Sequence, residues 1–113
     1  MVRERKQQYR QGDVLLVPVG WAPEGCRPIS PDHGRFVLAY GEATGHAHAL
    51  ATDSAEFFQE ENGPRRFLLI RGGKSVELRH EEHAPVSLLP GLYEVQRQRE
   101  YRDGERTWEP ASD

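Results

Sequence analysis

The chain has 113 residues, which is enough for one hydrophobic core but not for two. Its formal net charge of -3 argues against binding long duplex nucleic acid by charge alone, and its single cysteine excludes an intramolecular disulfide. No apolar run approaches the ~20 residues that cross a bilayer, and the N-terminus lacks the apolar stretch of a signal peptide. We therefore expect a single cytoplasmic domain over residues 1–113, with no membrane partner.

Residues 1–10 are polar and mostly basic, which predicts a solvated, flexible N-terminal arm, or an arm that contacts a phosphate-bearing partner or a second subunit. Beyond it, short apolar and β-branched runs are separated by clusters of glycine, proline, asparagine and aspartate, a pattern typical of strands and turns. About eight short strands are expected, within residues 13–19, 35–40, 46–51, 65–71, 75–80, 85–89, 92–101 and 106–109, and residues 54–59 are a further candidate.

Turn signals separate these strands. Pro18 cannot donate to a ladder and marks the edge or the end of the first strand. Residues 20–34 are rich in glycine and proline and predict a long irregular loop, while Asp103-Gly104 predicts a hairpin turn before the last strand. No segment of ten or more residues shows the 3.6-residue period of an amphipathic helix. The sequence therefore predicts a mostly β, single-domain antiparallel β-barrel or β-sandwich with little or no helix.

Four of the five histidines lie in two short clusters, Gly-His-Ala-His at residues 45–48 and His-Glu-Glu-His at residues 80–83. Each cluster lies at the end of a predicted strand. Histidine is the commonest metal ligand in proteins, and its unperturbed pKa lies near neutrality. Two such pairs in so short a chain indicate a functional site.

The alternation of side chains along a strand predicts where these imidazoles point. His46 and His48 share one face, lie ~6.5 Å apart and point in parallel, which suits two ligands of one ion or one substrate. His80 falls on the same face as the apolar Val76 and Leu78, which we expect to be the core side of its strand.

His83 follows three residues later, where Pro85 extends or turns the chain and allows the ring to fold back toward the same side. Three or four imidazoles, with a carboxylate from Glu81 or Glu82, would hold a divalent zinc, manganese, iron or nickel ion. Histidines that are only hydrogen-bonded, or that form dimer contacts, are the alternative. The residues predicted to line an open end of the barrel or sandwich, as catalytic groups or metal ligands, are His46, His48, His80 and His83.

A basic, aromatic-flanked segment follows at residues 93–101, where one face of the predicted strand carries tyrosine, valine, two arginines and a second tyrosine. Arginine offers a planar fork that fits phosphate or carboxylate, and tyrosine offers a ring that stacks against a base. Arg97, Arg99 and Tyr101 are therefore predicted to bind a small anionic or nucleotide-like substrate. The alternative is an exposed hairpin arm in which arginines and glutamates pair across the strands.

Five blocks of the sequence stand out together: Gln11–Pro18, Gly45–Ala49, His80–Pro85, Leu89–Val95 and Gln98–Tyr101. They resemble a group of small bacterial proteins of unassigned function, and the resemblance spans most of the chain.

The His-x-His at residues 46–48 and the later Pro90-Gly91 are also faintly similar to the His-x-His and Pro-x-Gly elements of cupins. In the second of these cupin elements a histidine follows the glycine, whereas this chain has Leu-Tyr-Glu at residues 92–94. A cupin-like site would therefore use His80 or His83.

The leading functional expectation is a small hydrolase with a histidine site, such as a phosphodiesterase or nuclease acting on RNA-like or cyclic-nucleotide substrates. With a metal, the histidines hold the ion and the ion lowers the pKa of bound water. Without one, one imidazole removes a proton from a 2′-hydroxyl and another protonates the leaving oxygen. In both cases Arg97 and Arg99 would stabilise the phosphoryl charge.

The competing expectation is a non-catalytic metal-binding or oligomer-assembly β module, in which the histidines tie subunits together. Hydrophobic residues make up 36 % of the chain, and this modest share makes a homodimer plausible.

Overall fold

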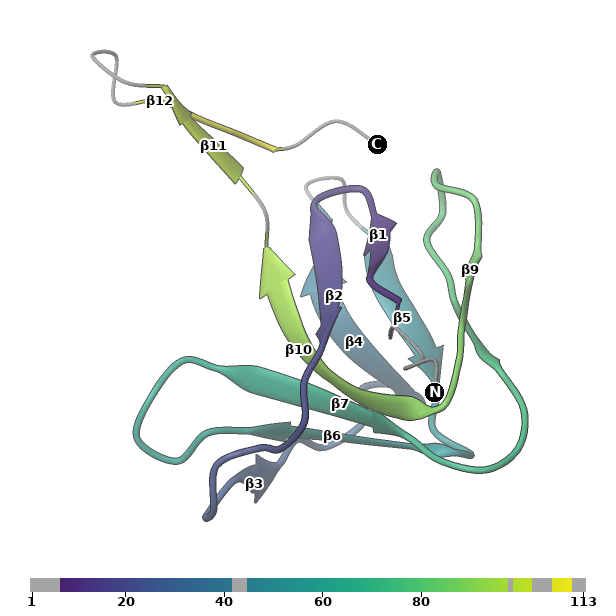
Figure 1. The fold of residues 1–113 in the computed structure, drawn as a ribbon. Coiled ribbons are helices and arrows are strands. Elements are labelled where there is room, and N and C mark those ends of the chain that lie inside the picture. Colours follow the sequence, from purple (N-terminus) through teal and green to yellow (C-terminus); the bar gives the residue numbers. More distant parts are fainter. Residues whose placement is uncertain (1–6, 42–44, 98, 103–106, 111–113) are drawn as a thin grey trace, which may run out of the picture.

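The computed structural model describes residues 7–41, 45–97, 99–102 and 107–110, with side chains for residues 7–41 and 45–97. Over these residues the chain forms twelve strands and no helix, which confirms the predicted β fold (Figure 1). The described part of the chain accordingly offers no helix that is long and apolar enough to cross a membrane. In chain order the strands are β1 (Tyr9–Gln11), β2 (Val14–Pro18), β3 (Arg27–Pro28), β4 (Arg35–Tyr40), β5 (Ala47–Ala51), β6 (Ala55–Gln59), β7 (Arg66–Ile70), β8 (Val76–Leu78), β9 (Val86–Leu88), β10 (Gly91–Arg97), β11 (Arg99–Arg102) and β12 (Thr107–Pro110).

The largest sheet has six antiparallel strands in the order β1-β2-β10-β7-β6-β3. Strand β10 lies inside this sheet and pairs with β2 on one side and β7 on the other. Val95 lies opposite Leu16 of β2, and Tyr93 lies opposite Leu68 of β7. All four side chains are buried, because alternate residues of neighbouring strands face the same side of a sheet.

Two hairpins, β4–β5 and β8–β9, contribute the rest of the core. They are joined by two reciprocal backbone hydrogen bonds between Ala49 of β5 and Arg79, directly after β8, with N–O distances of 2.9 and 2.8 Å. Leu38, Leu78 and Leu88 of the hairpins belong to the same buried cluster as the inward residues of the large sheet. The arrangement is sandwich-like, and the described strands do not close into a barrel (Figure 1).

The prediction of a flexible N-terminal arm over residues 1–10 is wrong for residues 9 and 10. Tyr9 and Arg10 belong to β1, and the Tyr9 side chain is buried. Its ring meets the Tyr93 ring edge to face at 5.8 Å, and its hydroxyl accepts a hydrogen bond from the Leu89 N–H at 3.3 Å. Composition missed this strand because only alternate residues of so short a segment face the core. Residues 1–6 lie outside the described residues.

One further boundary differs from expectation. The loop over residues 20–34 contains the two-residue strand β3, which pairs with the end of β6. The long strand expected over residues 92–101 is covered by β10 and β11, and β11 pairs with β12. Residue 98, between β10 and β11, and the Asp103-Gly104 turn expected between β11 and β12 lie outside the described residues. Strand β2 ends at Pro18, as predicted.

Candidate metal centre

The two histidine clusters lie side by side because the β4–β5 and β8–β9 hairpins meet there. His46 directly precedes β5 and His48 lies within it, whereas His80 and His83 follow β8. The antiparallel bridge between Ala49 and Arg79 fixes the register of β5 against the end of β8. In this register the residue before Ala49, His48, lies opposite the residue after Arg79, His80. Their ring centroids are 4.3 Å apart.

Two overlapping sets of donor atoms result from this register. In the first set, one ring nitrogen each of His48, His80 and His83 lie within 4.8 Å of one another. In the second set, His46, His80 and Glu81 meet the same condition. The His80 ring centroid lies 4.6 Å from that of His83 and 5.6 Å from that of His46. Since a neutral imidazole binds one ion through one nitrogen, the two sets compete for His80.

Gln11 of β1 fixes the orientation of His48, and sequence reasoning did not identify it. Its amide nitrogen donates to the backbone carbonyls of Leu78 and Ala84, both at 2.9 Å. These acceptors turn the amide so that Oε1 faces His48, whose Nδ1 lies 2.9 Å away. Because Oε1 can only accept, we assign the ring proton of His48 to Nδ1 and the lone pair to Nε2. Metal-binding histidines commonly donate their other N–H in this way.

His80 carries its proton on the opposite nitrogen. The backbone N–H of Glu82 donates to Nδ1 of His80 at 3.0 Å, so the ring proton of neutral His80 lies on Nε2. An ion bound at Nε2 would move this proton to Nδ1, and an ion bound at Nδ1 would displace the N–H of Glu82. In either case the hydrogen bond of the Glu82 amide changes when an ion binds through His80.

The environment keeps two of these imidazoles neutral. Burial, followed by the neighbouring His80, lowers the pKa of His48 from 6.5 to about 4. Burial, followed by the neighbouring His83, also lowers the pKa of His80. Both causes penalise the charged form of the ring. Neutral rings offer lone pairs to a cation, so the cluster is better suited to binding a metal than to donating protons.

Two glycines allow the backbone to approach these rings closely. Gly12 lies in the turn between β1 and β2 with a φ of 59°, and a Cβ there would come 2.8 Å from Nε2 of His83. A Cβ at Gly41, directly after β4, would come 2.9 Å from Cβ of His46 and 3.4 Å from Nε2 of His80. A larger residue at either position would therefore have to displace an imidazole or the backbone.

Asp13 follows directly in the same turn, and sequence reasoning also missed it. Its side chain is 11 % exposed, and its Oδ1 lies 3.8 Å from Nε2 of His48. Its Oδ2 accepts two hydrogen bonds from Arg97, from Nε at 2.8 Å and from Nη2 at 2.6 Å. The signal available in the sequence was a Gln-Gly-Asp turn, in which two polar residues flank a glycine just before a buried strand.

The predicted substrate-binding residues are placed only in part. Arg97 lies at the end of β10 and is brought next to the histidines by its contact with Asp13. The side chains of Arg99 and Tyr101 lie outside the described residues, so their predicted contacts with a substrate stay a prediction.

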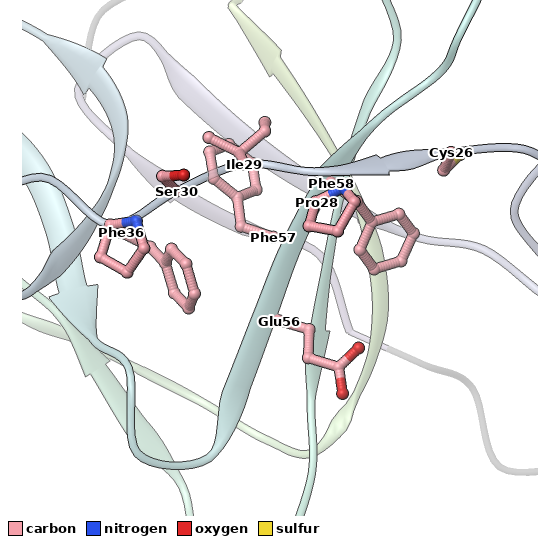
Figure 2. Close-up of a pocket in the computed structure, with 9 residues that line it drawn as sticks. Cys26, Pro28, Ile29, Ser30, Phe36, Glu56, Phe57 and Phe58 are labelled. Atoms are coloured by element: carbon pink, nitrogen blue, oxygen red, sulfur yellow. The ribbon is translucent and has the colours of Figure 1, made fainter.

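An apolar hollow of about 630 Å³ lies apart from the histidines (Figure 2). Phe36 and Phe57 line it, with one carboxylate, Glu56, which forms an ion pair with Arg71. Phe36 lies near the start of β4, whereas Ala39, which pairs with His48, lies near the end of that strand. The lining contains no histidine, and the hollow is therefore separate from the histidine cluster.

Both histidine clusters, Gln11 and Asp13 fall within the part of the chain that matches a known family. No curated protein and no solved structure matches the chain. A family model described as a domain of unknown function (DUF8820) matches residues 10–98, which confirms the expected resemblance to a family of unassigned function. The chain therefore belongs to the DUF8820 family.

Proposed function

We propose that this protein is a metal-dependent hydrolase whose divalent ion is held by His48, His80 and His83. The observation that carries the proposal is the convergence of one nitrogen from each ring to within 4.8 Å. Three neutral imidazoles with an open fourth position are the donor set of many catalytic zinc ions, and iron, manganese and nickel accept the same ligands. The ion would lower the pKa of a coordinated water and so supply a hydroxide nucleophile near neutral pH.

The protonation states favour this route over acid–base catalysis by histidine alone. Acid–base catalysis needs one imidazole that is protonated near the working pH and another that is a competent base. A pKa of about 4 leaves His48 neutral and weakly basic at pH 7, and the pKa of His80 is lowered too. Both changes weaken the acid–base route, and they leave the ring lone pairs free of protons that would compete with a metal ion near neutral pH.

The proposed substrate is a small phosphodiester, RNA-like or a cyclic nucleotide. Support comes from the guanidinium of Arg97, which lies beside the cluster through its contact with Asp13, and from the expected contribution of Arg99 and Tyr101. The net charge of -3 disfavours long duplex nucleic acid as the substrate. The lone cysteine suits a reducing cytoplasm, where we place the protein.

Metal binding and turnover are tested together on the purified protein. Elemental analysis and titration with Zn²⁺ should show one ion per chain, and bis(4-nitrophenyl) phosphate or 2′,3′-cyclic nucleotides should be hydrolysed until EDTA is added. His80→Ala should abolish both binding and turnover. His33→Ala is the matched control, because the side chain of His33 is 88 % exposed and bonds only to its neighbour Asp32 among the contacts described. Zinc binding without turnover of either substrate would reject the hydrolase.

Binding through His80 has its own spectroscopic reporter. Addition of Zn²⁺ should shift the amide resonance of Glu82, because its N–H now donates to Nδ1 of His80. An unchanged Glu82 amide in a zinc-bound sample would exclude His80 as a ligand.

A second candidate, a non-catalytic metal-binding or assembly module, is favoured by the second donor set. If His46 or Glu81 adds to the ligands around His80, the coordination sphere closes and no position is left for water. In that case Zn²⁺ would stabilise the fold or a homodimer without turnover. Size-exclusion chromatography with Zn²⁺ and with EDTA separates the two candidates, since only the assembly module predicts a metal-dependent dimer.

A further inference from the structure

A second arginine, Arg66, lies on the same face of the large sheet as Arg97. Arg66 is the first residue of β7 and pairs with Val95 of β10, and Arg97 lies two residues further along β10. Because alternate residues of a strand face the same side of a sheet, both arginines share the inner face on which Val95 is buried. Diagonal neighbours of this kind lie about 7–8 Å apart. The register therefore places the two arginines next to each other at one end of the inner face.

A buried aromatic ring positions the guanidinium of Arg66. Phe57 of β6 pairs with Leu68 of β7, which lies two residues after Arg66 on the same face. The Phe57 ring is 2 % exposed, and Cζ of Arg66 lies over it, 5.3 Å from the ring centroid. An aromatic face attracts a guanidinium and favours a stacked orientation, but it does not neutralise the charge as a carboxylate would.

The charge of Arg66 is not balanced by a carboxylate in the described part of the chain. Arg65, directly before it, faces the opposite side of the sheet and bonds to both oxygens of Glu94, each at 3.2 Å. Arg97 bonds to Asp13 through Nε and Nη2. Arg66 instead faces Arg97, and burial, followed by this like charge, lowers the pKa of Arg66. Since an arginine nevertheless stays protonated at neutral pH, a partly buried positive charge is left uncompensated here.

We propose that Arg66 is a substrate-binding residue, which donates to the phosphate of the substrate at an anion site on the inner face of the sheet beside Arg97. For the class of substrate, this inference rests on the proposed function. An anion there would relieve the repulsion between the two guanidinium groups, and the planar fork of Arg66 fits two oxygens of a phosphate. Arg97 also contacts Asp13, whose Oδ1 lies 3.8 Å from Nε2 of His48, so the anion site adjoins the histidine cluster.

The test is titration of the metal-free protein, in EDTA, with inorganic phosphate, followed through the backbone amide and guanidinium resonances. The wild-type chain should bind phosphate, and Arg66→Gln should raise the phosphate dissociation constant about tenfold or more, because charge-assisted hydrogen bonds are lost. Arg66→Lys keeps the charge but not the planar fork, and its affinity should lie between the two. Arg71→Gln is the matched control, because the side chain of Arg71 is 64 % exposed and pairs with Glu56, and it should leave the affinity unchanged. Circular dichroism and the melting temperature verify that each variant is folded.

A second measurement separates this inference from the proposed function. In the Zn²⁺-loaded protein, Arg66→Gln should raise the KM for a 2′,3′-cyclic nucleotide about tenfold and leave the Zn²⁺ dissociation constant unchanged. Hydrolysis by a wild-type chain that binds no phosphate, with the same KM in Arg66→Gln, would overturn the role of Arg66 and leave the hydrolase standing. Phosphate binding that depends on Arg66, in a chain that binds no Zn²⁺, would overturn the hydrolase and leave the anion site standing. An equal loss of phosphate affinity in Arg66→Gln and Arg71→Gln would assign the effect to net charge and would also overturn the inference.

Discussion

Replacement of Gln11 by alanine should be unusually costly for a polar residue in a three-residue strand. Its side chain makes three buried or partly buried hydrogen bonds, to the carbonyls of Leu78 and Ala84 and to Nδ1 of His48, each at 2.9 Å. A buried group that loses its partner costs roughly 1 kcal/mol or more, so we expect Gln11→Ala to lower the free energy of unfolding by about 3 kcal/mol. Urea denaturation of the metal-free protein measures this loss as a lower midpoint with an unchanged slope.

The same substitution should also weaken metal binding, for a different reason. Without Oε1 of Gln11, the ring proton of His48 is no longer held on Nδ1, and part of the population protonates Nε2 instead. The Zn²⁺ dissociation constant should rise about tenfold to a hundredfold. Gln96→Ala is the matched control, because Gln96 is exposed on β10, and it should change neither quantity. A loss of stability below about 0.5 kcal/mol together with unchanged zinc affinity would refute the role assigned to Gln11.

Three further predictions follow from the geometry. Burial lowers the pKa of His48 from 6.5 to about 4, so between these pH values the unfolded chain binds a proton that the folded metal-free chain does not. The free energy of unfolding should therefore be at its full value above about pH 6.5 and fall by up to about 3 kcal/mol toward pH 4. Urea unfolding at several pH values measures this fall, which should be smaller in His48→Gln. Gly12→Ala should lower the free energy of unfolding by more than about 1 kcal/mol and weaken zinc binding, because the new Cβ would come 2.8 Å from Nε2 of His83. Gly34 also has a positive φ but faces open space, so Gly34→Ala should show only the effect of backbone strain. Equal effects of the two substitutions on stability and on zinc titration would contradict the contact with His83. Tyr9→Ala should lower the free energy of unfolding by roughly 3 kcal/mol in the same urea assay, and a change near zero would show that β1 does not pack.

Much of the local structure could be predicted because strand signals are local. The run from Arg35 to Tyr40 became β4 with the boundaries expected, and Pro18 ended β2 because proline cannot donate to a ladder. The segment containing Tyr9 was missed, since two inward residues in three are too few for a period to show.

Local sequence signals predicted even less of how the histidine cluster is assembled. The sequence alone determined an all-β chain and placed four imidazoles at strand ends, because the two-residue repeat of a strand needs only neighbouring residues to be read. Only the tertiary structure decided that His48 lies opposite His80, and that Gln11, 37 residues earlier in the chain, accepts a hydrogen bond from the ring of His48. No local period encodes which strands pair or in which register; the burial of shared apolar faces across the whole chain selects it.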